Sequence, residues 1–142
     1  MTTGDDPTDE PPAQGLNEEL EAEAVTAANG RGPVVSRHSR EGVDVVALSG
    51  ELDLNSVQDI VPVLDQVLST QPGRLVVDLS RVSFADSSAL NLLLRTHSRT
   101  SLHLAGPLRP FVERLFEVTG ITGVLNVHPT LDDAVRAAVS RG

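Results

Sequence analysis

Apolar and polar residues alternate in two short consecutive segments, the first of which begins at residue 33. Residues 33–39 read PVVSRHS and residues 42–50 read GVDVVALSG, with a polar turn at Arg40 to Gly42 between them. This period of two predicts two strands, and the short turn predicts that they pair antiparallel. Three further β-rich runs, RLVVDLS, SLHLAG and VLNVH, predict strands at residues 74–80, 101–106 and 124–128.

Two segments between these strands carry apolar residues at the spacing of a helix. The first has Asp53, Asn55 or Ser56 as its possible N-cap, and Pro62 is expected to kink it or shift its start. Its predicted inward face is Val57, Ile60, Val61, Leu64, Val67 and Leu68. The second is predicted to turn one face inward and the other outward, with Leu90, Leu93, Leu94 and His97 inside and Ser88, Asn91 and Arg95 outside.

Two more helices are predicted toward the end of the chain. One lies within PLRPFVERLFEVTG, where Gly120 suits the C′ position and the inward residues are Val112, Leu115, Phe116 and Thr119. The last begins near Thr130, a good N-cap, and continues through Leu131, Ala134, Val135 and Ala138. Strands that alternate with helices predict an α/β fold, here a single domain over residues 33–142 with a mixed sheet of about five short strands and about four helices.

Residues 1–32 differ from the rest in charge and composition. They contain eight acids and one Arg, a net charge of −7, whereas residues 33–142 have a net charge of −2. Such a segment has too little apolar surface to offset the entropy lost on ordering. We therefore expect a disordered acidic tail, in which residues 17–28 form at most a transient helix.

The composition of the whole chain excludes several classes of function. A net charge of −9 disfavours binding to nucleic acid or to an anionic membrane surface. The absence of Cys rules out thiolate metal sites and fits a reducing compartment. The absence of Lys rules out the lysines of P-loops, Schiff bases and protein kinases. Neither a secretory signal nor a long apolar span is visible, so we expect a soluble, cytoplasmic protein.

The candidate nucleophiles and metal ligands do not form a working set. Ser87 and His97 lie ten residues apart on one predicted helix, which corresponds to about 15 Å along its axis and is too far for a hydrogen bond. A G-x-S-x-G elbow is absent, and the four histidines are not at ligand spacing. We expect no enzymatic activity, no metal and no cofactor.

The stretch FADSSAL, residues 84–90, occupies a turn between a predicted strand and a predicted helix. Functional residues of α/β folds concentrate at such turns. Asp86, Ser87 or Ser88 could cap the helix, and Glu51 and Asp53 of the earlier GELD segment could do the same for the preceding helix. A cap uses only one of the three residues at positions 86–88, so we expect a spare hydroxyl and a spare carboxylate at this corner.

Three blocks in this order, ALSGELDLNS, RLVVDLSRVSFADSSALNLLLR and LHLAGPLRPFVERLFEVTGI, resemble the STAS-domain anti-sigma factor antagonists of bacteria. The resemblance implies a STAS-like fold and a switch protein that binds an anti-sigma factor with serine kinase activity, which releases a sigma factor. It also implies that the kinase phosphorylates Ser87, that binding then ends, and that a PP2C-type phosphatase restores the protein.

The same resemblance implies a contact surface for the partner around Ser87. The residues predicted to contribute to it are Asp53, Asp86, Ser88, Ala89, Asn91, Leu92 and Arg95. Ala89 stands where the family usually has glycine. That departure keeps an alternative open, in which the domain is an unphosphorylated STAS scaffold or ligand-sensing module of a stressosome-like or transport-associated assembly.

Overall fold

The computed structural model describes residues 23–26, 34–70 and 72–141. The predicted alternation of strands and helices is present in them. The helices are α2 (Leu54–Leu68), α3 (Ser87–His97), α4 (Pro110–Thr119), the short 3₁₀ helix η2 (Ile121–Gly123) and α5 (Leu131–Arg141). The strands are β1 (Glu23–Thr26), β2 (Val34–Arg40), β3 (Val43–Leu52), β4 (Arg74–Ala85), β5 (Ser101–Ala105) and β6 (Asn126–His128).

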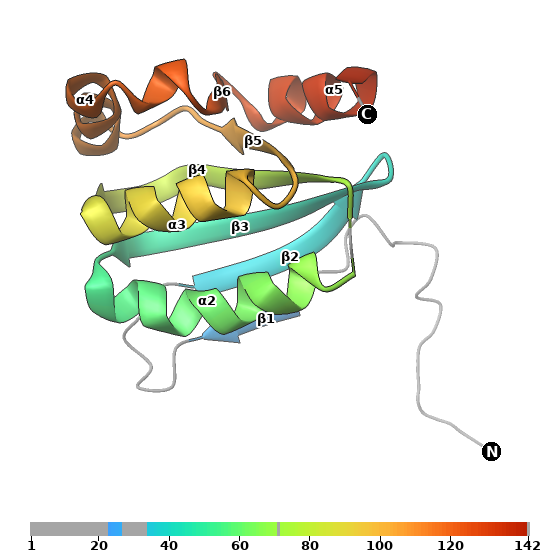
Figure 1. The fold of residues 1–142 in the computed structure, drawn as a ribbon, viewed down its shortest axis with the longest axis horizontal. Coiled ribbons are helices and arrows are strands. Elements are labelled where there is room, and N and C mark those ends of the chain that lie inside the picture. Colours follow the sequence, from blue (N-terminus) through green and yellow to red (C-terminus); the bar gives the residue numbers. More distant parts are fainter. Residues whose placement is uncertain (1–22, 27–33, 71, 142) are drawn as a thin grey trace.

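The strands form one mixed sheet in the order β1-β2-β3-β4-β5-β6 (Figure 1). The β1–β2 and β2–β3 pairs are antiparallel, and the pairs from β3 to β6 are parallel. Glu41 and Gly42 both have positive φ, 53° and 79°, as the tight turn of the β2–β3 hairpin requires. The predicted mixed sheet and antiparallel hairpin are confirmed.

Strand β1 was not predicted. Its four residues fall inside the range that the sequence analysis assigns to the acidic tail, and they pair antiparallel with Val34 to Arg37 of β2. Without β1 the backbone N–H and C=O groups along that edge of β2 would lack partners in the sheet, which explains why a weakly apolar segment pairs there. For Glu23–Thr26 the tail prediction is therefore wrong, and its remaining residues lie outside the described part of the chain.

The two faces of the sheet carry separate apolar clusters, because successive side chains of a strand point to opposite faces. On one face Val46, Leu75 and Val77 belong to the large cluster that α2, α3 and α4 cover. On the other face Val43, Val45 and Val76 pack with Ala134, Val135 and Ala138 of α5. In Figure 1, α2 and α3 run beside each other across the first face. All four predicted helices thus pack on the sheet.

Two details of the predicted helices are resolved by the structure. Helix α2 begins at Leu54, directly after Asp53, so Pro62 lies inside the helix and, of its two expected effects, does not shift the start. Thr119 is exposed rather than inward, because it is the last residue of α4 and its hydroxyl donates a hydrogen bond to the Leu115 carbonyl at 2.8 Å. Gly120 occupies the predicted left-handed position after α4, with φ of 73°.

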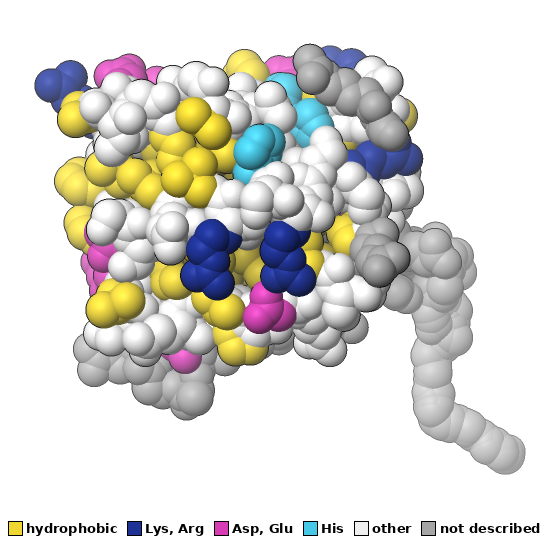
Figure 2. Space-filling model, in the orientation of Figure 1, with side chains coloured by type: hydrophobic (Ala, Val, Ile, Leu, Met, Phe, Trp, Pro, Cys, Tyr) yellow, Lys and Arg dark blue, Asp and Glu magenta, His cyan; other side chains and the backbone are white. Residues whose placement is uncertain are grey.

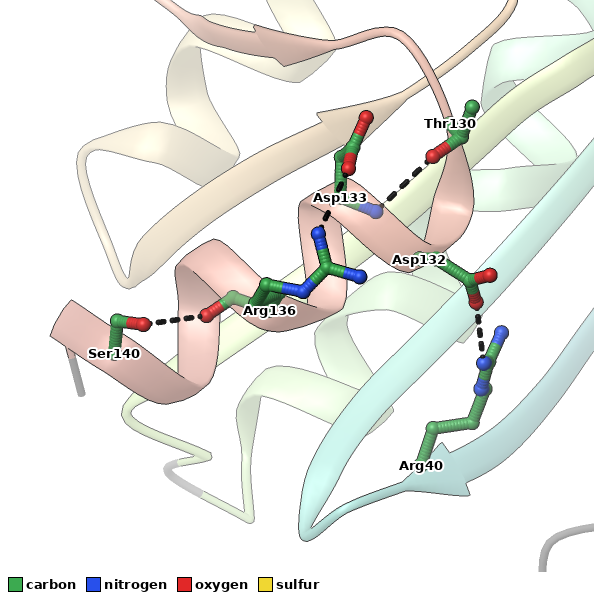
Figure 3. Close-up of polar contacts among 6 residues, drawn as sticks. All are labelled: Arg40, Thr130, Asp132, Asp133, Arg136 and Ser140. Atoms are coloured by element: carbon green, nitrogen blue, oxygen red, sulfur yellow. Dashed lines mark hydrogen bonds and ion pairs between the residues drawn. The ribbon is translucent and has the colours of Figure 1, made fainter.

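Helix α5 is joined to the β2–β3 hairpin by an ion pair (Figure 3). Arg40 Nη2 lies 2.6 Å from Asp132 Oδ1, although the two residues are far apart in the sequence. Thr130 caps α5 as predicted, since its hydroxyl oxygen accepts a hydrogen bond from the Asp133 N–H at 3.1 Å. The exposed ion pair contributes at most about 1 kcal/mol. The apolar contacts of α5 therefore supply most of its attachment.

His38 of β2 is expected to make the stability of the fold depend on pH. Partial burial and the nearby Arg40 lower the pKa of His38, and the Asp78 carboxylate opposes them. A lowered folded-state pKa means that the unfolded chain binds the proton first as pH falls. We expect His38 to lower the free energy of unfolding progressively below about pH 6.5.

Comparison with His38→Gln measures this contribution. In urea unfolding experiments between pH 7.5 and 5, wild type should lose more stability than the variant over the same range. Parallel pH profiles for the two proteins would show that His38 makes no such contribution.

Candidate functional site

The starts of α2 and α3 meet at one corner of the sheet, where β3 and β4 end. Leu52 and Ala85 are register partners at the carboxyl ends of these parallel strands. The Asp86 N–H donates a hydrogen bond to the Leu52 carbonyl at 3.2 Å, which holds the two strand ends together. Figure 1 shows both strands ending on the side where the two helices begin. The predicted strand-to-helix turn is therefore a corner built from two such turns.

An aspartate caps each helix. Asp53 Oδ1 accepts hydrogen bonds from the Ser56 N–H at 2.9 Å and the Ser56 hydroxyl at 3.0 Å, and these bonds lower the pKa of Asp53. Asp86 Oδ1 accepts from the N–H groups of Ser88 at 2.9 Å and Ala89 at 3.3 Å. Of the caps that the sequence left open, Asp53 and Asp86 are the ones used.

Because Asp86 is the cap, neither serine of the pair is needed for that role. Ser87 is the first residue of α3 and is exposed, whereas Ser88 is half-buried and is held through its backbone N–H. Within the described residues the Ser87 hydroxyl makes no hydrogen bond. Its oxygen is therefore accessible as a nucleophile for modification or as a contact for a binding partner.

The outward face of α3 carries part of the predicted contact surface. Ser87, Asn91 and Arg95 are all exposed and follow one another at intervals of four, so they form one stripe along the helix. Near the end of α3, Arg99 forms an ion pair of 2.9 Å with Asp65 of α2. Figure 2 shows basic side chains beside one another between α3 and α2 on this face.

Two residues predicted to contact a partner are buried instead. Ala89 is 1% exposed and Leu92 is 5% exposed, and both pack in the main apolar cluster. Leu94, predicted to be inward, is 38% exposed. Four leucines within five positions made the inward face of the helix ambiguous in the sequence. In the structure the inward face includes Leu92 and Thr96, and the buried Thr96 hydroxyl donates a hydrogen bond to the Leu92 carbonyl at 2.8 Å.

Sequence reasoning missed three apolar residues at this corner. The rings of Phe84 and Phe111 stack with their centroids 5.0 Å apart, and Phe111 and Leu54 are 51% and 57% exposed. Phe111 comes from α4, so no local pattern around Ser87 includes it. The available signal in the sequence was that Phe111, a large apolar residue next to Val112, lies outside the predicted inward face of α4.

We expect the cap of α3 to be measurable in stability. Asp86→Ala removes the acceptor of two backbone N–H groups and should lower the free energy of unfolding by about 1 kcal/mol. Asp86→Asn keeps an acceptor oxygen and should lose only a fraction of that. Urea denaturation measures both variants; an Asp86→Ala variant as stable as wild type would contradict the assigned cap.

The positions of the histidines and carboxylates bear on the catalytic and metal-binding sites that the sequence analysis considered. Ser87 and His97 lie at opposite ends of α3, as predicted. Among the described residues no three His, Asp or Glu side chains gather as possible metal ligands. The sequence did not indicate that His103 Nδ1 and His128 Nε2 lie 3.0 Å apart.

No described helix is long and apolar enough to cross a bilayer.

Comparison with known proteins places this arrangement in a family. The family model described as "Mlab, STAS domain" matches residues 35–140. The anti-sigma-F factor antagonist RsfB of Mycobacterium tuberculosis is 30% identical over 97 residues, which cover 66% of this chain and 80% of that protein. The family-model match runs from residue 35 in β2 to residue 140 in α5.

Solved structures agree with this relationship. The crystal structure of an anti-sigma factor antagonist from Mycobacterium paratuberculosis superimposes with a TM-score of 0.71 at 29% identity, covering 80% of this chain and 98% of that one. The Bacillus cell fate determinant SpoIIAA in its phosphorylated form shares the fold at 20% identity, with a TM-score of 0.54 and coverage of 72% and 97%. The chain therefore belongs to the STAS-domain family of anti-sigma factor antagonists.

Proposed function

We propose that this chain binds an anti-sigma factor with serine kinase activity, so that a sigma factor is released, and that phosphorylation of Ser87 ends the binding. A PP2C-type phosphatase would then restore the binding form. In this cycle the chain acts in the cytoplasm as a substrate and binding partner and catalyses no reaction itself. Relatives named as anti-sigma factor antagonists support the role.

The observation that carries the proposal is the exposed Ser87 hydroxyl at the start of α3. A kinase can reach this oxygen without unfolding the helix, because Ser87 is exposed and its side chain holds no other described residue in place. Ser88 is a poorer candidate for phosphorylation, since its side chain is half-buried. The geometry thus favours Ser87 over its neighbour.

A phosphate on Ser87 would change the surface more than the fold. It adds about −1.5 to −2 charges close to the carboxylate of Asp86, at a corner that also contains Asp53. The N-terminal N–H groups of α3 can accommodate an anion, so the helix need not unwind. A partner packed on the corner would meet added volume and repelling charge. The switch would therefore act on binding.

The substitution of Ala89 for the usual glycine bears on the alternative, an unphosphorylated scaffold or ligand-sensing module. Ala89 is 1% exposed, so its methyl group adds to the core and leaves the surface near Ser87 unchanged. Alanine is also the better helix former, by about 0.8–1 kcal/mol. This burial favours the phosphorylated switch over the scaffold.

Displacement of a sigma factor tests the proposed function. A fluorescently labelled sigma factor bound to its anti-sigma factor should be released when the unmodified chain is added, and anisotropy reports the release. Chain that has been phosphorylated beforehand should release far less. If the unmodified chain displaces no sigma factor from any anti-sigma kinase of its own organism, the proposed function is wrong.

A further inference from the structure

Two histidines from neighbouring strands are hydrogen-bonded to each other at the β6 edge of the sheet. His103 Nδ1 of β5 lies 3.0 Å from His128 Nε2 of β6. The ring centroids are 5.2 Å apart, which is close to the N···N distance plus the two ring radii, so the two nitrogens face each other directly. One nitrogen must then carry a proton and the other must accept it. We call His103 and His128 the histidine pair.

The pair lies on the face of the sheet that α5 covers. His103 is 1% exposed and is the register partner of Val76, which packs against α5. The residues that α5 contributes to this apolar cluster are Ala134, Val135 and Ala138. A charged ring in such surroundings is costly, because apolar neighbours do not replace the lost water. A proton on His103 is therefore unfavourable while α5 stays in place.

Charged side chains of α5 and β4 flank this part of the sheet, and each has a described partner of its own. They are Arg74, Asp78, Asp132, Asp133 and Arg136. The two aspartates of α5 are in ion pairs with arginines, and Asp78 accepts a hydrogen bond from a backbone N–H. Titration of the pair therefore removes none of these contacts.

His128 is the more accessible member of the pair. It is half-buried, and it lines a cavity of about 690 Å³ together with two exposed glutamates of α4, Glu113 and Glu117. We expect a first proton on His128 rather than on the buried His103. The hydrogen bond survives this step, because a charged His128 ring still donates from Nε2 to His103 Nδ1.

A second proton cannot be added without breaking the pair. With both rings charged, Nδ1 of His103 and Nε2 of His128 both carry hydrogen, and no acceptor is left between them. The unfolded chain has no such limit, because separate imidazoles each titrate near about pH 6.5. In acid the unfolded chain therefore binds at least one proton more than the folded chain, and the stability of the fold decreases as pH falls.

Strand β6 is the element that depends most directly on the pair. It has three residues, lies at the edge of the described sheet next to β5, and leads into α5. Its other described bonds to β5 and the following turn include the Gly106 N–H to the His128 carbonyl at 2.8 Å and the Asn126 amide to the Leu102 carbonyl at 3.2 Å. Short edge elements open at a lower free energy than the core of a sheet. Loss of the pair should therefore loosen β6 and α5 first.

We propose that the histidine pair is a proton-sensitive contact, which holds β6 and α5 on β5 at neutral pH and loosens them in acid. This inference goes beyond the proposed function and does not depend on it. Each excess proton bound by the unfolded chain raises the unfolding equilibrium constant about tenfold per pH unit. The pair thus gives the domain a built-in response to acid.

Urea unfolding between pH 7.5 and 5 tests the pair in a His38→Gln background, which removes the titration of His38. In this background, His103→Gln/His128→Gln replaces the pair by two amides that can hydrogen-bond but do not titrate. Between pH 6.5 and 5 we expect the unfolding constant of the parent to rise about tenfold or more beyond that of the double variant. His97→Gln removes a histidine outside the pair, and its profile should remain parallel to that of the parent.

An NMR titration of the wild-type chain provides a second test that does not require the double variant to fold. The imidazole C–H signals of His103 and His128 should together report at most one bound proton while the amides of β6 remain protected from exchange. Independent titration of both rings near about pH 6.5 with β6 still protected would overturn the inference. Parallel urea profiles for the parent and the double variant would overturn it as well. The proposed function would stand in either case, since displacement of a sigma factor tests it separately.

Discussion

Ser87→Asp should weaken binding to the anti-sigma kinase by about 30-fold or more, whereas Ser87→Ala should bind like wild type. The aspartate places a permanent charge beside Asp86 at the corner where α3 begins. Like charges brought together in an interface cost several kcal/mol, and about 2 kcal/mol already corresponds to a 30-fold change in Kd. Calorimetric titration without ATP measures both affinities.

Ser88→Asp is the matched control for this experiment. It adds the same charge one residue along, on a side chain that is half-buried. We expect Ser88→Asp to reduce the free energy of unfolding more than Ser87→Asp does, because its carboxylate enters a partly desolvated position. If Ser87→Asp and Ser87→Ala bind with equal affinity, charge at Ser87 does not control binding.

The largest effect on stability should come from Phe116→Ala. Phe116 is 1% exposed and packs in the main apolar cluster between α4 and the sheet. Loss of this ring leaves a cavity and should reduce the free energy of unfolding by about 3–5 kcal/mol. Urea denaturation followed by circular dichroism gives the value, provided that the variant still folds.

Phe111→Ala provides the comparison within the same helix. Its ring is 51% exposed, so truncation should cost much less, on the order of 1 kcal/mol. If the two variants lose equal stability, α4 is not anchored through Phe116. A thermal melt of each variant shows the same contrast where urea unfolding of Phe116→Ala is incomplete.

The domain could be predicted from the sequence because its strands and helices have clear periods. The alternating pattern of residues 42–50 is compatible only with a strand, found as β3. The spacing of apolar residues from Val57 to Leu68 is compatible only with a helix, found as α2. Strand β1 could not be predicted in this way. Its pairing depends on the open edge of β2, which is a property of the assembled sheet and not of residues 23–26.

The candidate site was predictable in position but not in every side chain. The turn at residues 84–90 located the corner, and local chemistry offered Asp86, Ser87 and Ser88 as possible caps of the helix, whereas the choice of Ser87 as the modified residue came from the family resemblance. The orientation of α3 could not be predicted, because a helix with four nearby leucines has two plausible inward faces. Leu92, predicted to contact a partner, is buried, and Leu94, predicted to point inward, is exposed. Phe111 reaches the corner only through the packing of α4 on β4.

Identification of the modified residue tests the central claim most directly. The dephosphorylated chain is incubated with its anti-sigma kinase and ATP, and the phosphorylated peptide is sequenced by mass spectrometry. We predict a single phosphate on Ser87 and none in the Ser87→Ala variant. A phosphate on Ser88 or Thr96 with Ser87 unmodified, or no phosphate at all in the presence of an active kinase, would contradict the account.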